Sequence, residues 1–496
     1  MYIGLDLGTS GVKAAAIDKY GCVHASCYKG LTMYGLEEGK RELCPQEVIE
    51  AAKEVLTDAI AKAGGENIEI ITVSSLGEAA IPIGKDGTIL MNSIIGSDRR
   101  GADALGNIKE QFNEKDITDI TGLNLSSIYT LNKLLYLQKE FPDVYAKTEK
   151  FLCFEDFAVW WLTGETVIDY SMASRTLAFD INSYSWSDKI LNRLNIDSSM
   201  FSTPAIAGTI VGELRANISH DLGIARNVKV AIGTHDHICN AIGAGAVTKG
   251  VCSNTCGTTE GITTIIGSKK MKSADIISNN ISCEPFAQPN IFNTVAWHNT
   301  AGAMINWFIK MFYDKPQDIG ALLKALDASC SDSPTKLVVH PHFSGATVNS
   351  MDENSKGSIF GLTLSTSKQE LFKALMEGST YELRLIISSL NQCSINVNNL
   401  VCSGGGSKSD VWMQIKADIT GLPIHCVECS DTGAVGAGII SAVALGHYTN
   451  IEEAAKVMVK SGKSFEPIEK NNRIYDERFA EYKGIYEKTK SISHIL

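Results

Sequence analysis

One pattern occurs twice in this 496-residue chain, at its start and near its midpoint: an apolar run, a turn with glycine and threonine, and a second apolar run. The first copy occupies residues 1–25, MYIGLDLGTSGVKAAAIDKYGCVHA, and the second begins at residue 251 with VCSNTCGTTEGITTII. Apolar runs joined by short glycine-containing turns are typical of β-hairpins. The same unit in each half predicts an internal duplication. We therefore expect an α/β fold with mixed sheets and two related domains, residues 1–246 and 247–496.

The two turns also have a chemical interpretation. Glycines let the backbone fold tightly, so several N–H groups can point at one anion, and neighbouring hydroxyls add donors. Asp6, at the end of the first strand, is an oxygen ligand of the kind that Mg²⁺ prefers. A plain hairpin is the alternative, since the turn is neither a GxxxxGK[ST] loop nor a GxGxxG motif that opens a helix. The residues expected to hold phosphates are Gly8, Thr9, Ser10, Gly257 and Thr258.

Composition excludes several classes of function. The net charge of −11 and the pI of about 5.5 argue against a nucleic-acid partner, because a phosphate backbone needs a basic surface. No apolar run reaches the roughly 18 residues that span a bilayer, and the first residues lack the features of a signal peptide. The 13 Cys are scattered and odd in number, as in reduced proteins. We expect a cytoplasmic protein that binds neither nucleic acid nor membrane, and a homodimer stays open.

Polar residues follow the apolar run at 68–74, where a buried strand is expected to end. Glu78 ends the short polar stretch 74–78 that follows this run, and Asp98 and Arg99 lie further along the chain. Residues at the carboxyl ends of parallel strands commonly face a ligand. Acids and guanidinium groups together match the hydroxyls of a polyhydroxylated ligand. The alternative for the segment Asp98-Arg99-Arg100 is a solvated loop with a surface ion pair.

Two further segments carry candidate chemistry. The strand expected at 228–232 leads to Asp236 and His237. Asp236 can serve as a proton acceptor, or it can simply cap the helix that follows it. Three glycines at 404–406 separate another apolar strand from a helix that begins at Asp410. Glycines in that position permit close approach of a flat ring or a ribose.

These segments, in this order, resemble the FGGY family of carbohydrate kinases, part of the wider group of actin, hexokinase and Hsp70-like ATPases. The resemblance covers nearly the whole chain and rests on several motifs. They are GLDLGTSGVK at the first turn, GTHDHICNAIGAG around Asp236, NTCGTT at the second turn, SGGGSKSDVWMQIKADITGLPI at the three glycines, and HFSGATVNSMDENSKGSIFGL between them. Any single motif is weak, but their shared order makes a specific signal.

The resemblance implies two actin-like ATPase domains of ribonuclease H-like fold, with ATP between them and a carbohydrate deep in the cleft. It implies phosphoryl transfer from Mg-ATP to a sugar or polyol hydroxyl, with Asp236 as the catalytic base and Asp6 positioning Mg²⁺. The ATP-binding residues would be Gly8, Thr9, Ser10, Gly257, Thr258, Gly404, Gly405, Gly406 and Asp410. The substrate-binding residues would be Glu78, Asp98, Arg99, Asp236 and His237.

Subfamily motifs argue against glycerol as the substrate. Glycerol kinases carry an Arg-Glu pair where this chain has Gly77 and Glu78, and an aromatic residue where it has Ile128. The ASRT segment at 173–176 does resemble glycerol kinases, whereas the Met-His pair of xylulose and gluconate kinases is absent. The missing arginine leaves space, so we expect a longer ligand, a ketose such as a pentulose of the xylulose type. A polyol or aldonate kinase and a non-catalytic ATP-binding protein of the actin or Hsp70 kind are the alternatives.

Overall fold

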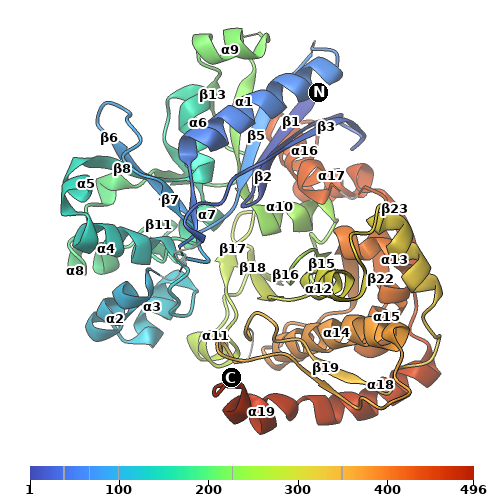
Figure 1. Ribbon diagram of the computed structural model, residues 1–496. Coiled ribbons are helices and arrows are strands. Elements are labelled where there is room, and N and C mark those ends of the chain that lie inside the picture. The colour runs from blue at the N-terminus through green and yellow to red at the C-terminus, as the bar shows by residue number, and fades with distance from the viewer. Residues whose placement is uncertain (37–39, 66, 99, 226, 348–349, 430) are drawn as a thin grey trace.

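The computed structural model describes residues 1–496 except 37–39, 66, 99, 226, 348–349 and 430. Within the described residues, two large mixed sheets, one from each half of the chain, form the centres of two lobes (Figure 1). The first lobe, blue to green, lies at the upper left of the view, and most of the second lobe, yellow to red, lies at the lower right. The predicted α/β class with mixed sheets is confirmed.

The first sheet contains the predicted N-terminal hairpin and its continuation into a third strand. Its strand order is β13 (Ile210–Glu213), β14 (Lys229–His235), β5 (Ile70–Ser75), β1 (Tyr2–Leu7), β2 (Gly11–Ile17) and β3 (Val23–Gly30). β1 pairs antiparallel with β2 and parallel with β5, and β5 is parallel to β14. The carboxyl ends of β1, β5 and β14 therefore meet at one edge of the sheet.

The second sheet repeats these pairings. Its strand order is β17 (Glu284–Pro285), β18 (Phe292–His298), β16 (Glu260–Gly267), β15 (Val251–Cys256), β21 (Asn399–Ser403), β22 (Ile424–Val427) and β23 (Ser461–Phe465). β15 pairs antiparallel with β16 and parallel with β21, as β1 does with β2 and β5. The duplication is thus visible in the strand pairing. In this copy, α11 (Ser273–Asn279) and β17 separate the second strand of the hairpin from the third.

Helices cover the first sheet on both faces. α1 (Pro45–Lys62) packs against β2 and β3, and α6 (Phe154–Thr163) packs against β5 and β14. α10 (Asp236–Gly243) packs against α16 (Thr432–Ala444), which comes from the second half of the chain yet also contacts β1. A Cβ atom on Gly436 would lie 2.0 Å from the Cys239 carbonyl oxygen, so the close crossing of these two helices requires a glycine there.

The rest of the first lobe consists of a small sheet, several short strands and the helices that pack around them. A small sheet has the order β4 (Glu42–Leu43), β7 (Ser93–Ile94), β6 (Ala80–Gly84) and β8 (Thr148–Cys153). The remaining strands here are β9 (Val167–Asp169), β10 (Phe179–Asp180), β11 (Ser185–Trp186) and β12 (Thr203–Ala205). The helices are α2 (Ala102–Gln111), α3 (Glu114–Thr121), α4 (Thr130–Glu140), α5 (Pro142–Lys147), α7 (Tyr170–Ser174), α8 (Asp188–Arg193), η2 (Ser198–Met200) and α9 (Ala216–Leu222).

In the second lobe, the long helix α14 (Lys368–Gln392) and its neighbours enclose one apolar core. The other helices of this half are α12 (Gly302–Phe312), α13 (Ile319–Ala328), η3 (Gly405–Lys408), α15 (Asp410–Thr420), α17 (Ile451–Met458), α18 (Glu469–Tyr482) and α19 (Ile485–Ser493). A short hairpin pairs β19 (Val338–His340) with β20 (Ser358–Phe360). Among the helices in the described part of the chain, none has both the length and the apolar character needed to cross a membrane.

Two local expectations differ from the structure. The sequence pattern over 131–145 predicts a helix, but the structure divides this segment into α4 and α5, because Pro142 cannot continue the backbone hydrogen bonding of a helix. The sequence pattern over 168–179 predicts a polar strand and a turn, but the structure has the helix α7 in this segment. The Asp169 carboxylate starts this helix by accepting hydrogen bonds from the Ser171 and Met172 amides at 2.7 and 2.9 Å.

Candidate active site between the lobes

A cavity of about 750 Å³ lies between the lobes and is lined by residues from both. From the first lobe it is lined by Thr9, Glu78 and Asp236, and from the second by Thr259 and Trp297, among others. Thr9 belongs to the turn between β1 and β2, and Thr259 to the turn between β15 and β16. Both duplicated turns therefore reach the same space.

Asp236 follows β14 directly and is the first residue of α10. The cap position of this helix is His235, and no side chain caps it by a hydrogen bond. The Asp236 side chain is 27% exposed, lines the cavity, and its Oδ1 atom has no hydrogen-bond partner among the described residues. Burial raises the pKa of the Asp236 carboxyl, and although His237 opposes this rise, the negative charge of Glu78 adds to it. Asp236 is thus an available proton acceptor in the cavity rather than the cap of α10.

Two histidines flank Asp236. His235 Nε2 lies 3.3 Å from Asp236 Oδ1, but burial lowers the pKa of His235 well below its ordinary value. A neutral His235 therefore supplies no positive charge to the carboxylate. The His237 side chain is 39% exposed, lines the cavity, and has its Nε2 atom 4.0 Å from Asp236 Oδ1. Its predicted contact with a substrate stays a prediction.

Asp6 ends β1 close to Asp236. Its Oδ1 atom accepts a hydrogen bond from Ser74 Oγ at 3.2 Å. Burial and the negative charge of Asp236 raise the pKa of Asp6 to about 7. The carboxylates of Asp6 and Asp236 thus repel each other, and a bound divalent cation would relieve this repulsion.

The turns that carry the predicted phosphate-binding residues are held by their own backbones. The Gly8 amide donates to the Gly11 carbonyl oxygen at 3.0 Å, and the Gly257 amide to the Thr259 carbonyl oxygen at 2.9 Å. These two glycines therefore shape the turns and do not offer their own N–H groups to a ligand. The exposed residues of the turns are Thr9, Ser10, Thr258 and Thr259. Thr259, which we did not single out from the sequence, lines the cavity with Thr9.

The three glycines at 404–406 have different roles. Gly404 has φ +83°, and a Cβ atom there would lie 2.6 Å from the Cys256 carbonyl oxygen. A Cβ atom on Gly406 would lie 2.3 Å from the Cys256 sulfur. These two glycines thus let the segment pack against the end of β15, beside the second turn. A Cβ atom on Gly405 would meet nothing within 4 Å, so Gly405 is the glycine that faces open space.

Asp410 begins α15, four residues after Gly406 and one after the capping Ser409. Its carboxylate is 57% exposed and accepts hydrogen bonds from Lys463 Nζ at 2.8 and 2.6 Å. The predicted contact of Asp410 with a nucleotide base therefore competes with an existing ion pair.

Gly405→Leu should raise the KM for ATP by about tenfold or more, which corresponds to roughly 1.4 kcal/mol of lost binding. The new side chain would occupy the open space in which we expect the adenosine to lie, without a clash in the fold itself. The KM for the sugar should stay within about twofold, as expected when only nucleotide binding is affected. Gly106→Leu is the matched control, since a Cβ atom there also meets nothing within 4 Å. Equal changes in both KM values would show that the adenosine site lies elsewhere.

Glu78 lies in the cavity wall with φ +64°, a conformation that non-glycine residues rarely adopt. Its Oε1 atom accepts hydrogen bonds from Nε of Arg175 at 2.5 Å and from Nη2 of the same residue. Arg175 Nη1 donates in turn to Glu284 Oε1 at 3.0 Å. Arg175 follows α7 in the first lobe, whereas Glu284 belongs to β17 of the second sheet. The predicted substrate residue Glu78 is therefore tied to the second lobe through one arginine.

Asp98 also lines the cavity, but its carboxylate is committed to the protein. It is 2% exposed and accepts hydrogen bonds from the Arg41 amide at 2.6 Å, the Arg100 amide at 2.8 Å and the Arg100 guanidinium. Although burial opposes it, hydrogen bonding to Arg100 holds the pKa of Asp98 below its usual range. The expected alternative of a solvated surface pair is wrong, and a direct sugar contact from Asp98 stays a prediction. Arg99, its predicted partner in substrate binding, lies outside the described residues.

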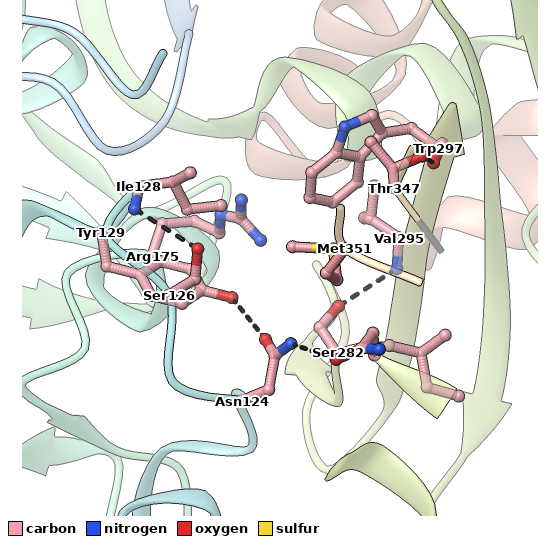
Figure 2. Close-up of a pocket in the computed structure, with 12 residues that line it drawn as sticks. Asn124, Ser126, Ile128, Tyr129, Arg175, Ser282, Val295, Trp297, Thr347 and Met351 are labelled. Carbon is pink, nitrogen blue, oxygen red and sulfur yellow. Dashed lines mark hydrogen bonds between the residues drawn. The ribbon is translucent and has the colours of Figure 1, made fainter. Parts of the chain in front are cut away.

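A second, narrow pocket of about 10 Å³ continues the cavity between the lobes. Figure 2 shows Asn124, Ser126, Tyr129 and Arg175 on one side of it and Ser282, Val295, Trp297 and Met351 on the other. Arg175, Val295, Trp297 and Met351 line both spaces. Sequence reasoning missed Arg175 as a site residue, although the ASRT segment contained it. It also missed Trp297, for which no local motif gave a signal.

A buried charged network lies behind the second turn. Lys416 of α15 donates to Glu260 Oε1, and Glu260 Oε2 accepts from Ser379 Oγ at 2.9 Å and lies 3.1 Å from His298 Nε2. The side chains of Lys416 and Glu260 are fully buried. Glu260 begins β16 directly after the second turn, so this pair links that turn to the helix that follows the three glycines. Sequence reasoning missed the pair, because its members are far apart in the chain.

Comparison with known families supports the interpretation of both halves. The N-terminal domain of the FGGY family of carbohydrate kinases matches residues 1–243. The C-terminal domain of the same family matches residues 252–445. Together these matches cover most of the chain.

Individual proteins resemble this chain over its full length. Xylulose kinase from Bacillus subtilis (strain 168) is 27% identical over 496 residues, which cover 100% of this chain and 98% of that protein. The crystal structure of ligand-bound xylulose kinase from Lactobacillus acidophilus is 25% identical, with a TM-score of 0.89 and coverage of 99% and 98%. The crystal structure of gluconate kinase from the same organism is also 25% identical, with a TM-score of 0.89 and coverage of 98% of each chain.

Proposed function

This chain belongs to the FGGY family of carbohydrate kinases, and on that premise we propose that it transfers the γ-phosphoryl group of Mg-ATP to a hydroxyl of a ketose, a pentulose of the xylulose type. As a member of the family, it is a phosphotransferase with an alcohol group as acceptor. The observation that carries the proposal is the position of Asp236, whose Oδ1 atom has no hydrogen-bond partner among the described residues, in a cleft that both glycine-threonine turns reach.

Phosphoryl transfer requires positioning and charge stabilisation more than covalent chemistry by the protein. The proton of the attacking sugar hydroxyl passes to Asp236 Oδ1, whose raised pKa suits a general base. Thr9 and Ser10 of the first turn and Thr258 and Thr259 of the second would orient the phosphates from opposite lobes. The open space at Gly405 would receive the adenosine.

The residues present fit a Mg²⁺ ion beside the first turn. Asp6 offers a carboxylate oxygen, the ligand type that Mg²⁺ prefers, next to the second negative charge of Asp236. Lys13 is the nearby cation that already favours the charged form of Asp6. When bound, Mg²⁺ would neutralise the negative charge of the phosphates.

The charges around Arg175, where we expect the sugar to bind, favour a neutral acceptor over an aldonate. Glu78 and Glu284 share the guanidinium of Arg175, so these three groups carry a net negative charge. A carboxylate on the acceptor would add repulsion in a site that excludes water. Arg41 and Lys356 also line the cavity, but both are exposed, where solvent screens their charge. The full-length similarity to a xylulose kinase supports the same choice, and the similarity to a gluconate kinase keeps an aldonate as the second candidate.

An ADP-release assay across pentuloses, hexuloses, tetruloses, polyols and aldonates tests the substrate proposal. We expect the highest kcat/KM for a pentulose, lower values for polyols, and the lowest for aldonates of equal length. A preference for an aldonate or a polyol would contradict the ketose assignment while leaving the kinase assignment intact.

The pH dependence of kcat/KM should show an acid limb that belongs to Asp236. The carboxylate must be ionised to accept a proton, so activity is lost as the pH falls through its pKa. Because burial raises that pKa, the limb should lie above the value of about 3.9 for an exposed aspartate. The measurement is kcat/KM for the sugar between pH 4 and 9 with saturating Mg-ATP. A profile that stays flat down to about pH 4 would show that Asp236 is not the base.

A further inference from the structure

Arg175 is a buried arginine at the boundary of the two lobes. It is 4% exposed, and its guanidinium lies 5.1 Å from the centre of the Tyr129 ring. Figure 2 shows its side chain beside Tyr129, at the edge of the pocket that separates the lobes. The guanidinium donates to Glu78 through Nε and Nη2 and to Glu284 through Nη1. The positive charge of Arg175 is therefore shared between Glu78, which lines the cavity, and Glu284 of the second lobe.

Both carboxylates form ion pairs with Arg175. Glu284 is fully buried, and its Oε2 atom has no hydrogen-bond partner among the described residues. Glu78 is 13% exposed at its side chain and lines the cavity. A buried carboxylate without a counter-charge is costly, and Arg175 is the charged donor that the structure gives to both.

Among the described residues, Glu78 has one oxygen that accepts no hydrogen bond and can contact a ligand. Oε1 is occupied by Arg175, whereas no described residue donates a hydrogen bond to Oε2. The left-handed backbone of Glu78, with φ +64°, is held by Thr130 Oγ1, which donates to the Glu78 carbonyl oxygen at 3.0 Å. Strained conformations of this kind persist where the surrounding contacts fix them, and they cluster at ligand sites. Thr130 thus holds the backbone of Glu78, and Arg175 holds its side chain.

We propose that Arg175 is the positioning residue that sets acceptor specificity: it fixes Glu78 so that Oε2 accepts a hydrogen bond from a hydroxyl of a neutral ketose, and it joins this contact to the second lobe through Glu284. The proposal rests on the sugar-kinase function above. The net negative charge of the three groups strengthens a hydrogen bond from a hydroxyl and repels an acceptor that carries a carboxylate. Because the group spans both lobes, the orientation of Glu78 depends on how the lobes are placed.

The first test is a double-mutant cycle with Glu78→Gln and Arg175→Lys. Glu78→Gln should raise the KM for the pentulose by roughly tenfold to a hundredfold, the range expected for loss of a charged hydrogen-bond acceptor. Arg175→Lys keeps the charge but loses the fork that holds Glu78, so it should raise the same KM. The KM for ATP should stay within about twofold in both variants. The double variant should be little worse than Glu78→Gln alone, because Arg175 acts through Glu78.

The second test uses Glu284→Gln, which keeps the shape of the side chain and makes the group of three neutral. It should lower the ratio of kcat/KM for the ketose to kcat/KM for the aldonate of equal length by about tenfold, as the repulsion of the carboxylate falls. Glu54→Gln is the matched control, since Glu54 is an exposed glutamate that pairs with Lys29 at 2.9 Å and does not line the cavity. It should leave this ratio unchanged.

Independent effects of Glu78→Gln and Arg175→Lys, or equal rises in the KM for ATP and sugar, would overturn the proposal and leave Arg175 a merely structural residue. If Arg175→Lys does not fold, the variants Glu78→Gln and Glu284→Gln test the proposal by themselves. An unchanged substrate ranking in both variants would then overturn the proposal. The wild-type protein separates this outcome from a failure of the proposed function. If the wild type releases ADP in the presence of sugar and the mutant effects are additive, only the role of Arg175 is contradicted. If the wild type shows no sugar-dependent ADP release, the kinase assignment itself is contradicted.

Discussion

Asp236→Asn should lower kcat for sugar phosphorylation by roughly 10²–10⁴, the range expected for the loss of one general base. Asparagine keeps the shape of the side chain, and the turns that would hold the phosphates lie on other segments. The dissociation constants for ATP and sugar should therefore stay close to those of the wild type. Steady-state kinetics and calorimetric titration with each ligand measure both effects.

Asp221→Asn is the control for this substitution, because Asp221 is an exposed aspartate paired with Lys53 at 2.7 Å. It should leave kcat unchanged. Near-wild-type turnover in Asp236→Asn would show that another group accepts the proton. Loss of ATP binding in that variant would place Asp236 in the metal site with Asp6 instead.

Lys416→Met should destabilise the protein by about 3–5 kcal/mol, because it leaves the fully buried Glu260 carboxylate without its cation. Although burial acts to raise it, the charge of Lys416 holds the pKa of Glu260 well below its usual range. A depressed carboxyl pKa contributes stability above the unfolded value of about 4.3, and this contribution is lost as the pH falls toward the folded value. The free energy of unfolding should therefore be measured by urea denaturation at pH 7, where the difference from the wild type is largest.

The double variant Lys416→Met with Glu260→Gln is the control for the ion pair. It removes both charges, so it should recover most of the stability lost in Lys416→Met. A double variant as unstable as the sum of the single variants would show that the two charges act independently. Because Glu260 follows the second turn, we also expect Lys416→Met to raise the KM for ATP more than the KM for the sugar.

The fold could be predicted from the sequence because its strongest signals are local. Each copy of the hairpin lies within one short segment, and the turns at Gly8 and Gly257 each contain a Gly-Thr pair and join two antiparallel strands. The order of the motifs then indicated how the halves are arranged. α7 was missed for a local reason as well, since the capping role of Asp169 overrides the strand-like pattern around it.

The wall of the cavity around Arg175, where we propose that the sugar binds, could not be predicted in the same way. Arg175 and Glu284 are separated by 109 residues, and no periodic pattern relates them. For the segment Asp98-Arg99-Arg100 the sequence suggested a solvated loop with a surface ion pair, whereas the structure buries the Asp98 carboxylate against Arg100. Whether a loop segment is buried depends on elements far away in the chain, so its local sequence did not indicate this burial. The role of Gly405 was indistinguishable from those of Gly404 and Gly406 for a similar reason, since only the position of Cys256 separates them.

One measurement tests the central claim most directly: the amounts of ADP and of sugar phosphate formed in the same reaction with a pentulose such as xylulose. If Asp236 activates a sugar hydroxyl in the cleft between the lobes, ADP and sugar phosphate should form in equal amounts, and Asp236→Asn should lower both together. ADP release that does not depend on the sugar, with no sugar phosphate formed from any acceptor tested, would contradict the account and favour a protein that binds ATP without phosphorylating a carbohydrate.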